Sequence, residues 1–83
     1  MKILRMPAVL EETGHRSQAS IYNAIRVGLF TKAVRIGQRS VGWPLDEVHA
    51  INAARISGLS DAEIRDLVIR LHGLRSELFA PLK

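Results

Sequence analysis

Side chains that can form paired hydrogen bonds with base edges gather in one short stretch of this 83-residue chain. Gln18, Asn23 and Arg26 are of this kind, and Ser20 and Tyr22 can bind a phosphate or a base. Bases are read in the major groove of DNA, which is wide enough for an α-helix. The stretch therefore favours a DNA-reading helix. The alternative is a helix whose polar face is only solvated, because polar residues fill any exposed face.

The helix that would carry these side chains has clear start and stop signals. Ser17 can accept a hydrogen bond from a free N–H at the helix start, and Gly28 is suited to follow the helix end. We therefore expect a helix over residues 18–27. A shorter helix precedes it, starting at Pro7 and ending before Gly14. Two helices joined by a tight turn predict a helix-turn-helix, whose second helix lies in the major groove.

A change of hydrophobic period follows this pair of helices. Apolar residues alternate with others over residues 34–36 and 41–43, which predicts two short strands. The hairpin tip between them carries Gln38, Arg39 and Ser40. A hairpin beside a reading helix is a wing, and an arginine at its tip could enter a minor groove or bind phosphate. A charged surface turn without a ligand is the alternative.

Positive charge is concentrated in the same half of the chain. Residues 1–43 hold seven Lys or Arg against two Glu, a net charge of +5, whereas residues 44–83 hold five against six acids, a net charge of −1. An anionic partner would therefore bind the first half. The candidate DNA contacts come from the second helix, its flanks and the hairpin: Arg16, Ser17, Gln18, Ser20, Tyr22, Asn23, Arg26, Lys32, Arg35, Gln38, Arg39 and Ser40.

Several short motifs follow one another in a distinctive order: Arg5-Met6-Pro7, Gly14, Ser20-Ile21-Tyr22, Ile25-Arg26, Gly28-Leu29-Phe30, Val34-Arg35-Ile36-Gly37 and Val41-Gly42-Trp43. In these motifs the sequence resembles the AlpA family of prophage transcriptional regulators, over residues 3–55. The resemblance implies a winged helix-turn-helix, similar to the DNA-binding domains of MerR-type regulators and phage excisionases. It also implies regulation of phage or mobile-element genes, sometimes through excision.

Two positions depart from the pattern of that family. The family commonly has prolines where this chain has Thr31-Lys32-Ala33, so the resemblance implies a less rigid segment before the first wing strand. A tryptophan usual in the third helix is Ile51 here, which keeps the core apolar. The remaining tryptophan, Trp43, precedes Pro44 at the start of that helix, and we expect it to be core rather than a stacking platform.

The last part of the chain predicts a long amphipathic helix. Ser60 and Glu63 have the spacing of a capping box, which opens a helix expected over residues 61–79. Its apolar residues repeat at intervals of three and four, as in the seam of a coiled coil. This favours a homodimer, which would place two reading helices on a two-part site. The alternative is that the helix folds back on its own domain. The seam residues are Ile64, Leu67, Leu71, Leu74 and Leu78.

Together these patterns predict a mainly α protein with a small β-hairpin. A winged helix-turn-helix domain is expected over residues 1–58 and a C-terminal helix for self-association over residues 59–83. His15, His49 and His72 are far apart and lack the spacing of metal ligands, and no nucleophile lies near a base, so no metal, cofactor or enzymatic activity is expected. The apolar runs are too short for a signal peptide or a membrane span, which favours a cytoplasmic protein associated with the nucleoid of a bacterial host.

The predicted function is sequence-specific DNA binding by a transcriptional regulator of phage or mobile-element genes. Residues 18–27 would lie in the major groove, and residues 34–43 would lie on the adjacent backbone or minor groove. The expected partners are double-stranded DNA and a second copy of the chain, with an integrase or RNA polymerase as further candidates. Two alternatives remain open: an excisionase-type recombination accessory factor, and a protein-interaction adaptor that uses the leucine seam without DNA.

Overall fold

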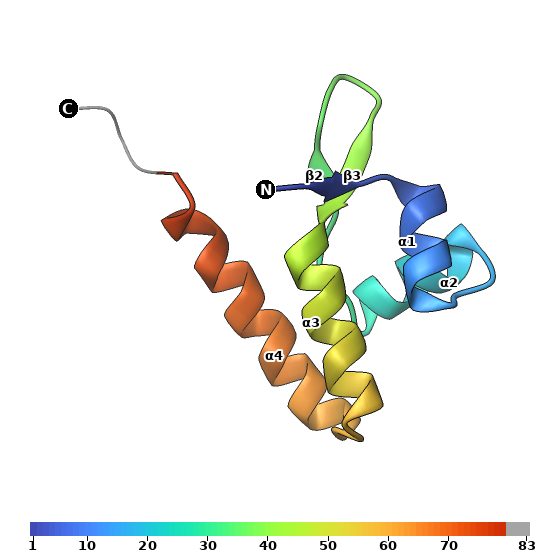
Figure 1. Ribbon diagram of the computed structural model, residues 1–83, viewed down its shortest axis with the longest axis vertical. Coiled ribbons are helices and arrows are strands. Elements are labelled where there is room, and N and C mark those ends of the chain that lie inside the picture. The colour runs from blue at the N-terminus through green and yellow to red at the C-terminus, as the bar shows by residue number, and fades with distance from the viewer. Residues whose placement is uncertain (80–83) are drawn as a thin grey trace.

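The computed structural model describes residues 1–79, in which four α-helices and a 3-10 turn accompany three short strands (Figure 1). The helices are α1 (Met6–Thr13), α2 (Gln18–Arg26), α3 (Leu45–Ile56) and α4 (Asp61–Leu74), and the 3-10 turn is η1 (Arg75–Glu77). The strands are β1 (Ile3–Leu4), β2 (Val34–Arg35) and β3 (Val41–Pro44). The predicted mainly α fold with a small β part is confirmed.

The two amino-terminal helices end at the glycines that the sequence marks. Gly14 and Gly28 adopt left-handed backbone conformations, with φ of 77° and 82°, which residues with a Cβ rarely adopt. The Ser17 hydroxyl accepts a 3.2 Å hydrogen bond from the N–H of Ser20 and so caps α2. The helix ends at Arg26, one residue earlier than expected.

The sheet has three antiparallel strands in the order β1-β3-β2, rather than the two of the predicted hairpin. The sequence indicates only an extended segment at β1, because two residues are too few for a periodic signal. Gly42 lies where β1 meets β3. A Cβ at this position would lie 2.7 Å from the carbonyl oxygen of Leu4 and 2.5 Å from the side chain of Ile3. The close approach of the two strands therefore requires glycine.

The core lies between the sheet and the first three helices. Trp43 is fully buried, as predicted, and its Nε1 donates a 2.8 Å hydrogen bond to the carbonyl oxygen of Thr31. Phe30 packs near the same indole, with ring centroids 6.2 Å apart. Ile21, from the inner face of α2, and Ile51 of α3 are also buried. One core thus fixes both α2 and the segment that leads into β2.

Helix α4 lies along α3 (Figure 1). The predicted capping box is confirmed: Ser60 Oγ accepts from the N–H of Glu63, whose carboxylate accepts from the N–H of Ser60. The prediction of one helix to residue 79 is wrong at its end, because α4 stops at Leu74 and η1 follows. Gly73 has a low helix propensity, and the Ser76 hydroxyl occupies its carbonyl oxygen, so the last turn tightens.

The first half of α4 contributes to the same core as the amino-terminal elements. Ile64 and Val68 are buried there, so the boundary expected at residue 58 separates elements that share one core. Residues 80–83, the end of the expected C-terminal region, lie outside the described residues. None of the helices within residues 1–79 has both the length and the hydropathy that crossing a membrane requires.

Candidate nucleic-acid interface

The outer face of α2 carries the polar residues that the sequence singles out. Tyr22, Asn23 and Arg26 are exposed, whereas Ile21 and Ala24 on the opposite face are buried. A helix anchored by its apolar face presents its polar side chains in defined positions. These three predicted DNA contacts therefore point away from the hydrophobic interior. At the start of the helix, the exposed candidates are Arg16, Ser17 and Gln18, and Ser20 is half-buried.

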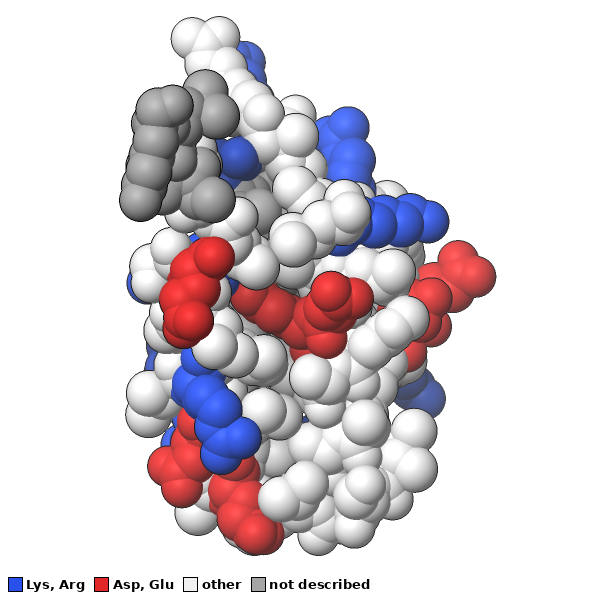
Figure 2. All heavy atoms as spheres, turned by 60° about the vertical axis from the view of Figure 1, so that its left-hand side comes forward, with Lys and Arg blue, Asp and Glu red and all other residues white. Residues whose placement is uncertain are grey.

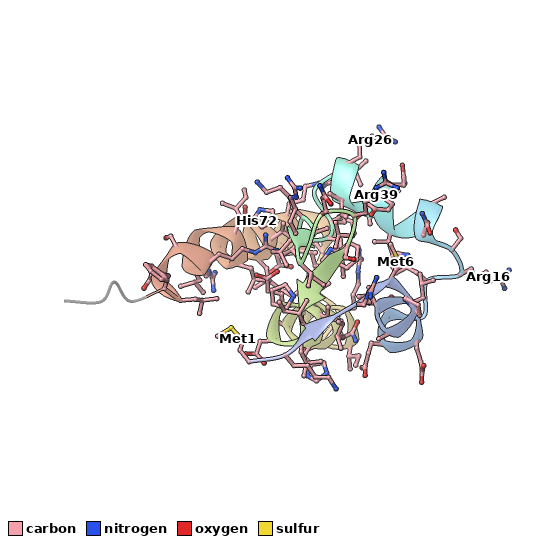
Figure 3. All side chains as sticks on the ribbon, turned by 90° about the horizontal axis from the view of Figure 1, so that it is seen from above. Met1, Met6, Arg16, Arg26, Arg39 and His72 are labelled. Atoms are coloured by element: carbon pink, nitrogen blue, oxygen red, sulfur yellow. The ribbon has the colours of Figure 1, made fainter. Side chains whose placement is uncertain are left out.

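The β2–β3 hairpin projects beyond the helices (Figure 1). The rings of Tyr22 in α2 and Trp43 in β3 are 6.3 Å apart between centroids, which ties the two elements together. Figure 3 shows Arg26 and Arg39 on the same side of the molecule, with Arg16 at the opposite end of α2. The exposed polar residues of the helix and of the hairpin together make up the candidate surface. The hairpin candidates are Arg35, Gln38 and Arg39, which are exposed, and Ser40, which is half-buried.

Several of the candidate contacts on α2 and at its start already have partners within residues 1–79. Arg26 donates a 2.6 Å hydrogen bond to Oδ1 of Asn23, one turn earlier, which holds both side chains on the outer face. The hydroxyl of Ser17 is occupied by the helix cap, and that of Ser20 lies 2.6 Å from Nδ1 of His15. The two serines therefore support the local structure of the turn.

The cationic candidates have fewer internal partners. Within residues 1–79, the side chains of Arg16, Arg35 and Arg39 take part in no hydrogen bond or ion pair. Arg5 was missed as a candidate, and its guanidinium lies 3.5 Å from Oγ of Ser40 in the hairpin. Arg5 directly follows β1, and it comes near Ser40 because β1 pairs with β3 of the hairpin, which the sequence does not indicate. Exposed cations that are not neutralised within the chain are available to phosphate groups.

Lys32 differs from the other candidates because its backbone is bound by the C-terminal region. Its N–H donates a 3.0 Å hydrogen bond to Nε2 of His72, and its carbonyl oxygen accepts a 2.6 Å hydrogen bond from Arg75. Together with the indole bond to Thr31, these contacts hold the segment before β2. The segment that the resemblance implies to be less rigid is thus hydrogen-bonded to α4 and η1.

The His72 and Arg75 side chains are themselves positioned by charge and burial. Arg75 forms two 2.7 Å hydrogen bonds with the carboxylate of Glu47, which is only 5% exposed. Burial, followed by the positive charges of Arg75 and Lys32, lowers the pKa of His72 below its ordinary value of 6.5. The imidazole is therefore neutral at neutral pH and can accept a hydrogen bond.

No three metal-binding side chains come together within residues 1–79. His15 contacts Ser20, and His72 binds the Lys32 backbone. Nε2 of His49 lies 3.7 Å from a carboxylate oxygen of Glu12. Each histidine thus has a partner of its own inside the chain.

The five seam residues do not form one face open to a partner. Ile64 is fully buried in the chain's own core, and Leu67 and Leu71 are half-buried against it. Leu74 and Leu78 are 46% and 55% exposed, and they line a groove of about 150 Å³ at the end of α4. The first half of the helix therefore folds back on its own domain, while the last two leucines stay accessible.

The side of the molecule that bears α4 differs in charge from the hairpin. Figure 2 shows this side, where acidic side chains extend across the middle and lower part and basic ones lie among them. The exposed acids of α3, α4 and η1 are Asp46, Asp61, Glu63, Asp66 and Glu77. An anion would meet less positive charge here than at α2 and the hairpin.

Two helices joined by a tight turn, with a β-hairpin beside the second helix, define a winged helix-turn-helix. The chain belongs to the family described as Prophage CP4-57 regulatory protein (AlpA), which it matches over residues 2–56. It is also 40% identical, over 57 residues, to uncharacterized protein ORF88 of Enterobacteria phage P4. That alignment covers 69% of this chain and 64% of the relative, so the chain spans less than two thirds of the relative's length. No solved structure matches the chain.

Proposed function

We propose that this AlpA-family protein is a sequence-specific DNA-binding transcriptional regulator of phage or mobile-element genes. The observation that carries the proposal is the common surface of α2 and the hairpin, with Asn23 and Arg26 facing outward beside the wing that bears Arg39. In this proposal α2 lies in the major groove, where Asn and Arg can form paired hydrogen bonds with bases. Arg35 and Arg39 bind the adjacent backbone or minor groove.

The polar candidates then divide by role. Gln18, Tyr22, Asn23 and Arg26 read bases or bind the groove edge, because they face outward from α2. Ser17 can offer its backbone N–H or a shared hydroxyl, because its Oγ accepts the cap bond from the N–H of Ser20. Ser20 can offer only a hydroxyl that it shares with His15. The phosphate-binding candidates are Arg16, Lys32, Arg35, Gln38, Arg39 and Ser40.

The test is binding to a DNA duplex chosen from the genomic fragments that the purified protein retains. Arg26→Ala should weaken binding by about 1–3 kcal/mol and relax the base preference at one position. Arg39→Ala should weaken binding to all sequences and reduce the salt slope by about one. Arg70→Ala is the control, because Arg70 is exposed on α4 and its substitution removes the same single positive charge. If neither hairpin nor α2 variant weakens binding and the salt slope is near zero, the proposal is wrong.

An excision accessory factor would bind DNA through the same surfaces as a transcriptional regulator. The two roles differ only in whether DNA binding changes recombination or transcription. The family's regulatory character favours the transcriptional role. A recombination assay with an integrase of the same element separates them. Loss of excision in Arg26→Ala without a change in transcription would favour the accessory factor, and the reverse would favour the regulator.

We further propose that the protein forms a homodimer through the exposed end of the seam and acts in the cytoplasm of its bacterial host. Leu74 and Leu78 are the accessible members of the seam. A Leu74→Lys and Leu78→Lys double variant should sediment as a monomer where the wild type sediments as a dimer. Ile69→Lys is the control, because Ile69 is 69% exposed but is not one of the seam leucines. Binding of an integrase, RNA polymerase or another protein by a monomeric wild type would instead favour the adaptor.

A further inference from the structure

The segment that joins α2 to β2 is held at both ends by side chains of the C-terminal region. Arg65 of α4 donates a 2.9 Å hydrogen bond to the carbonyl oxygen of Val27, where α2 ends. At the other end of the segment, His72 accepts from the N–H of Lys32 at 3.0 Å, and Arg75 donates to its carbonyl oxygen at 2.6 Å. The three side chains span about three helical turns. Side chains of α4 and η1 therefore bind both ends of the segment that joins α2 to β2.

These contacts determine how the two candidate DNA-binding elements lie relative to each other. The grip on Val27 directly follows Arg26, the last residue of α2. The grip on Lys32 lies two residues before β2, which begins the hairpin. In both places the bound groups belong to the backbone, so the contacts fix the path of the chain. A small shift in either would move the hairpin against α2.

We propose that α4 and η1 together form a brace that positions the wing against the recognition helix, with Arg65, His72 and Arg75 as its positioning residues. This role rests on the DNA-binding function proposed above. The match to the AlpA family ends at residue 56, and α4 begins at Asp61. The brace is therefore supplied by a part of the chain outside the matched region. It acts through the backbone and needs no contact with DNA.

The contact made by His72 requires a neutral ring with its proton on Nδ1. Protonation would turn Nε2 from an acceptor into a donor and break the bond to the N–H of Lys32. The charged groups that face the ring are Arg75 and Lys32, which oppose protonation, and Glu47, which favours it. Because burial and the two cations prevail, the folded-state pKa of His72 lies below 6.5. The bond is therefore present at neutral pH and is lost as the pH falls through that lowered pKa.

The experiment compares His72→Ala with His72→Gln by amide hydrogen exchange and by DNA binding. Glutamine keeps an oxygen acceptor near the position of Nε2 and does not titrate. In His72→Ala, the Lys32 amide should exchange faster and DNA affinity should fall about fivefold, the equivalent of one hydrogen bond. The salt slope should not change, because no phosphate contact is removed. His72→Gln should restore both values. As the pH falls below 6.5 and through the lowered pKa of His72, the wild type should lose protection at Lys32 and His72→Gln should keep it.

Arg65→Ala tests the other end of the brace. It should lower DNA affinity more than Arg70→Ala, which removes the same charge from the same helix without a contact to the segment. Equal losses in the two variants would reduce the effect of Arg65 to charge alone and would overturn its positioning role.

Each remaining outcome decides a different claim. Unchanged exchange at Lys32 in His72→Ala overturns the brace itself. Faster exchange with unchanged affinity overturns its role in DNA binding and leaves the proposed function intact. A smaller salt slope in His72→Ala overturns positioning in favour of a direct DNA contact. A wild-type protein that binds no duplex refutes the proposed function, and the role of the brace in DNA binding fails with it, even if Lys32 exchange responds as expected.

Discussion

Basic side chains behave differently in the hairpin and in the C-terminal region. Arg75 binds a buried carboxylate and a backbone carbonyl, and Arg65 binds the end of α2. In the described chain, Arg35 and Arg39 of the hairpin have no such partners. Arg65 and Arg75 of the C-terminal region thus hold the fold together, whereas Arg35 and Arg39 of the hairpin remain free for a ligand. A count of charges along the sequence cannot separate these two uses, whereas the partners of each guanidinium can.

The largest expected effect on stability follows from removing an arginine of the C-terminal region. Arg75→Ala leaves the carboxylate of Glu47 buried without its partner, and this should lower the free energy of unfolding by about 3 kcal/mol. Urea unfolding measures the loss. A Glu47→Leu and Arg75→Met double variant should recover most of it, because no buried charge remains.

The matched change in the hairpin is Arg39→Ala, which should alter stability by less than about 0.5 kcal/mol. It removes an exposed side chain that has no partner within residues 1–79. A loss for Arg75→Ala no larger than that for Arg39→Ala would contradict the division between structural and free arginines.

A second contrast compares the stability effects of replacing Gly42 and Gly73 by alanine, and the effect at Gly42 should be larger. In Gly42→Ala the new methyl group would meet the carbonyl oxygen of Leu4 at 2.7 Å, and backbone cannot move aside cheaply. We expect a destabilisation of about 2 kcal/mol, as for other overpacked sites. Urea unfolding and the dispersion of the amide NMR spectrum measure it. A neutral effect would show that β1 does not pack closely on β3.

The other glycine, Gly73 in α4, should show a smaller effect of the opposite sign. A Cβ at Gly73 would meet no atom within 4 Å, and the residue lies in a helix, where alanine is favoured. Gly73→Ala should therefore stabilise the protein by about 0.5–1 kcal/mol. Thermal unfolding measures the gain. Destabilisation would mean that the change from α4 to η1 depends on this glycine.

Local signals in the sequence predicted most of the elements. The cap at Ser17, the capping box at Ser60 and the helix-ending Gly14 and Gly28 each act within a few residues, so their effects can be read along the chain. Strand β1 was missed because it contains two residues and is defined by its partner. The end of α4 was misplaced because Gly73, and the Ser76 hydroxyl that binds its carbonyl oxygen, lie within the apolar repeat and do not interrupt it.

In the candidate site, too, local features could be predicted from the sequence and long-range contacts could not. The amphipathic period of α2 correctly placed Tyr22, Asn23 and Arg26 on its outer face. The contacts that hold the wing could not be predicted, since Arg75 and Glu47 are 28 residues apart and His72 and Lys32 are 40 apart. Such pairs meet only because α4 returns along α3. The packing of α4 along α3 also buries Ile64, which the heptad spacing had predicted to lie in a dimer interface.

The most direct test of DNA binding by α2 and the hairpin is an NMR titration of the labelled protein with the duplex that it retains from genomic fragments. We predict that the backbone amides of residues 16–26 and 34–43, together with the Arg26 and Arg39 side-chain signals, shift or broaden as duplex is added. Amides on the outer side of α4, around Asp66 and Arg70, should change little. Changes confined to α4, or an unaltered spectrum at saturating duplex, would contradict the account.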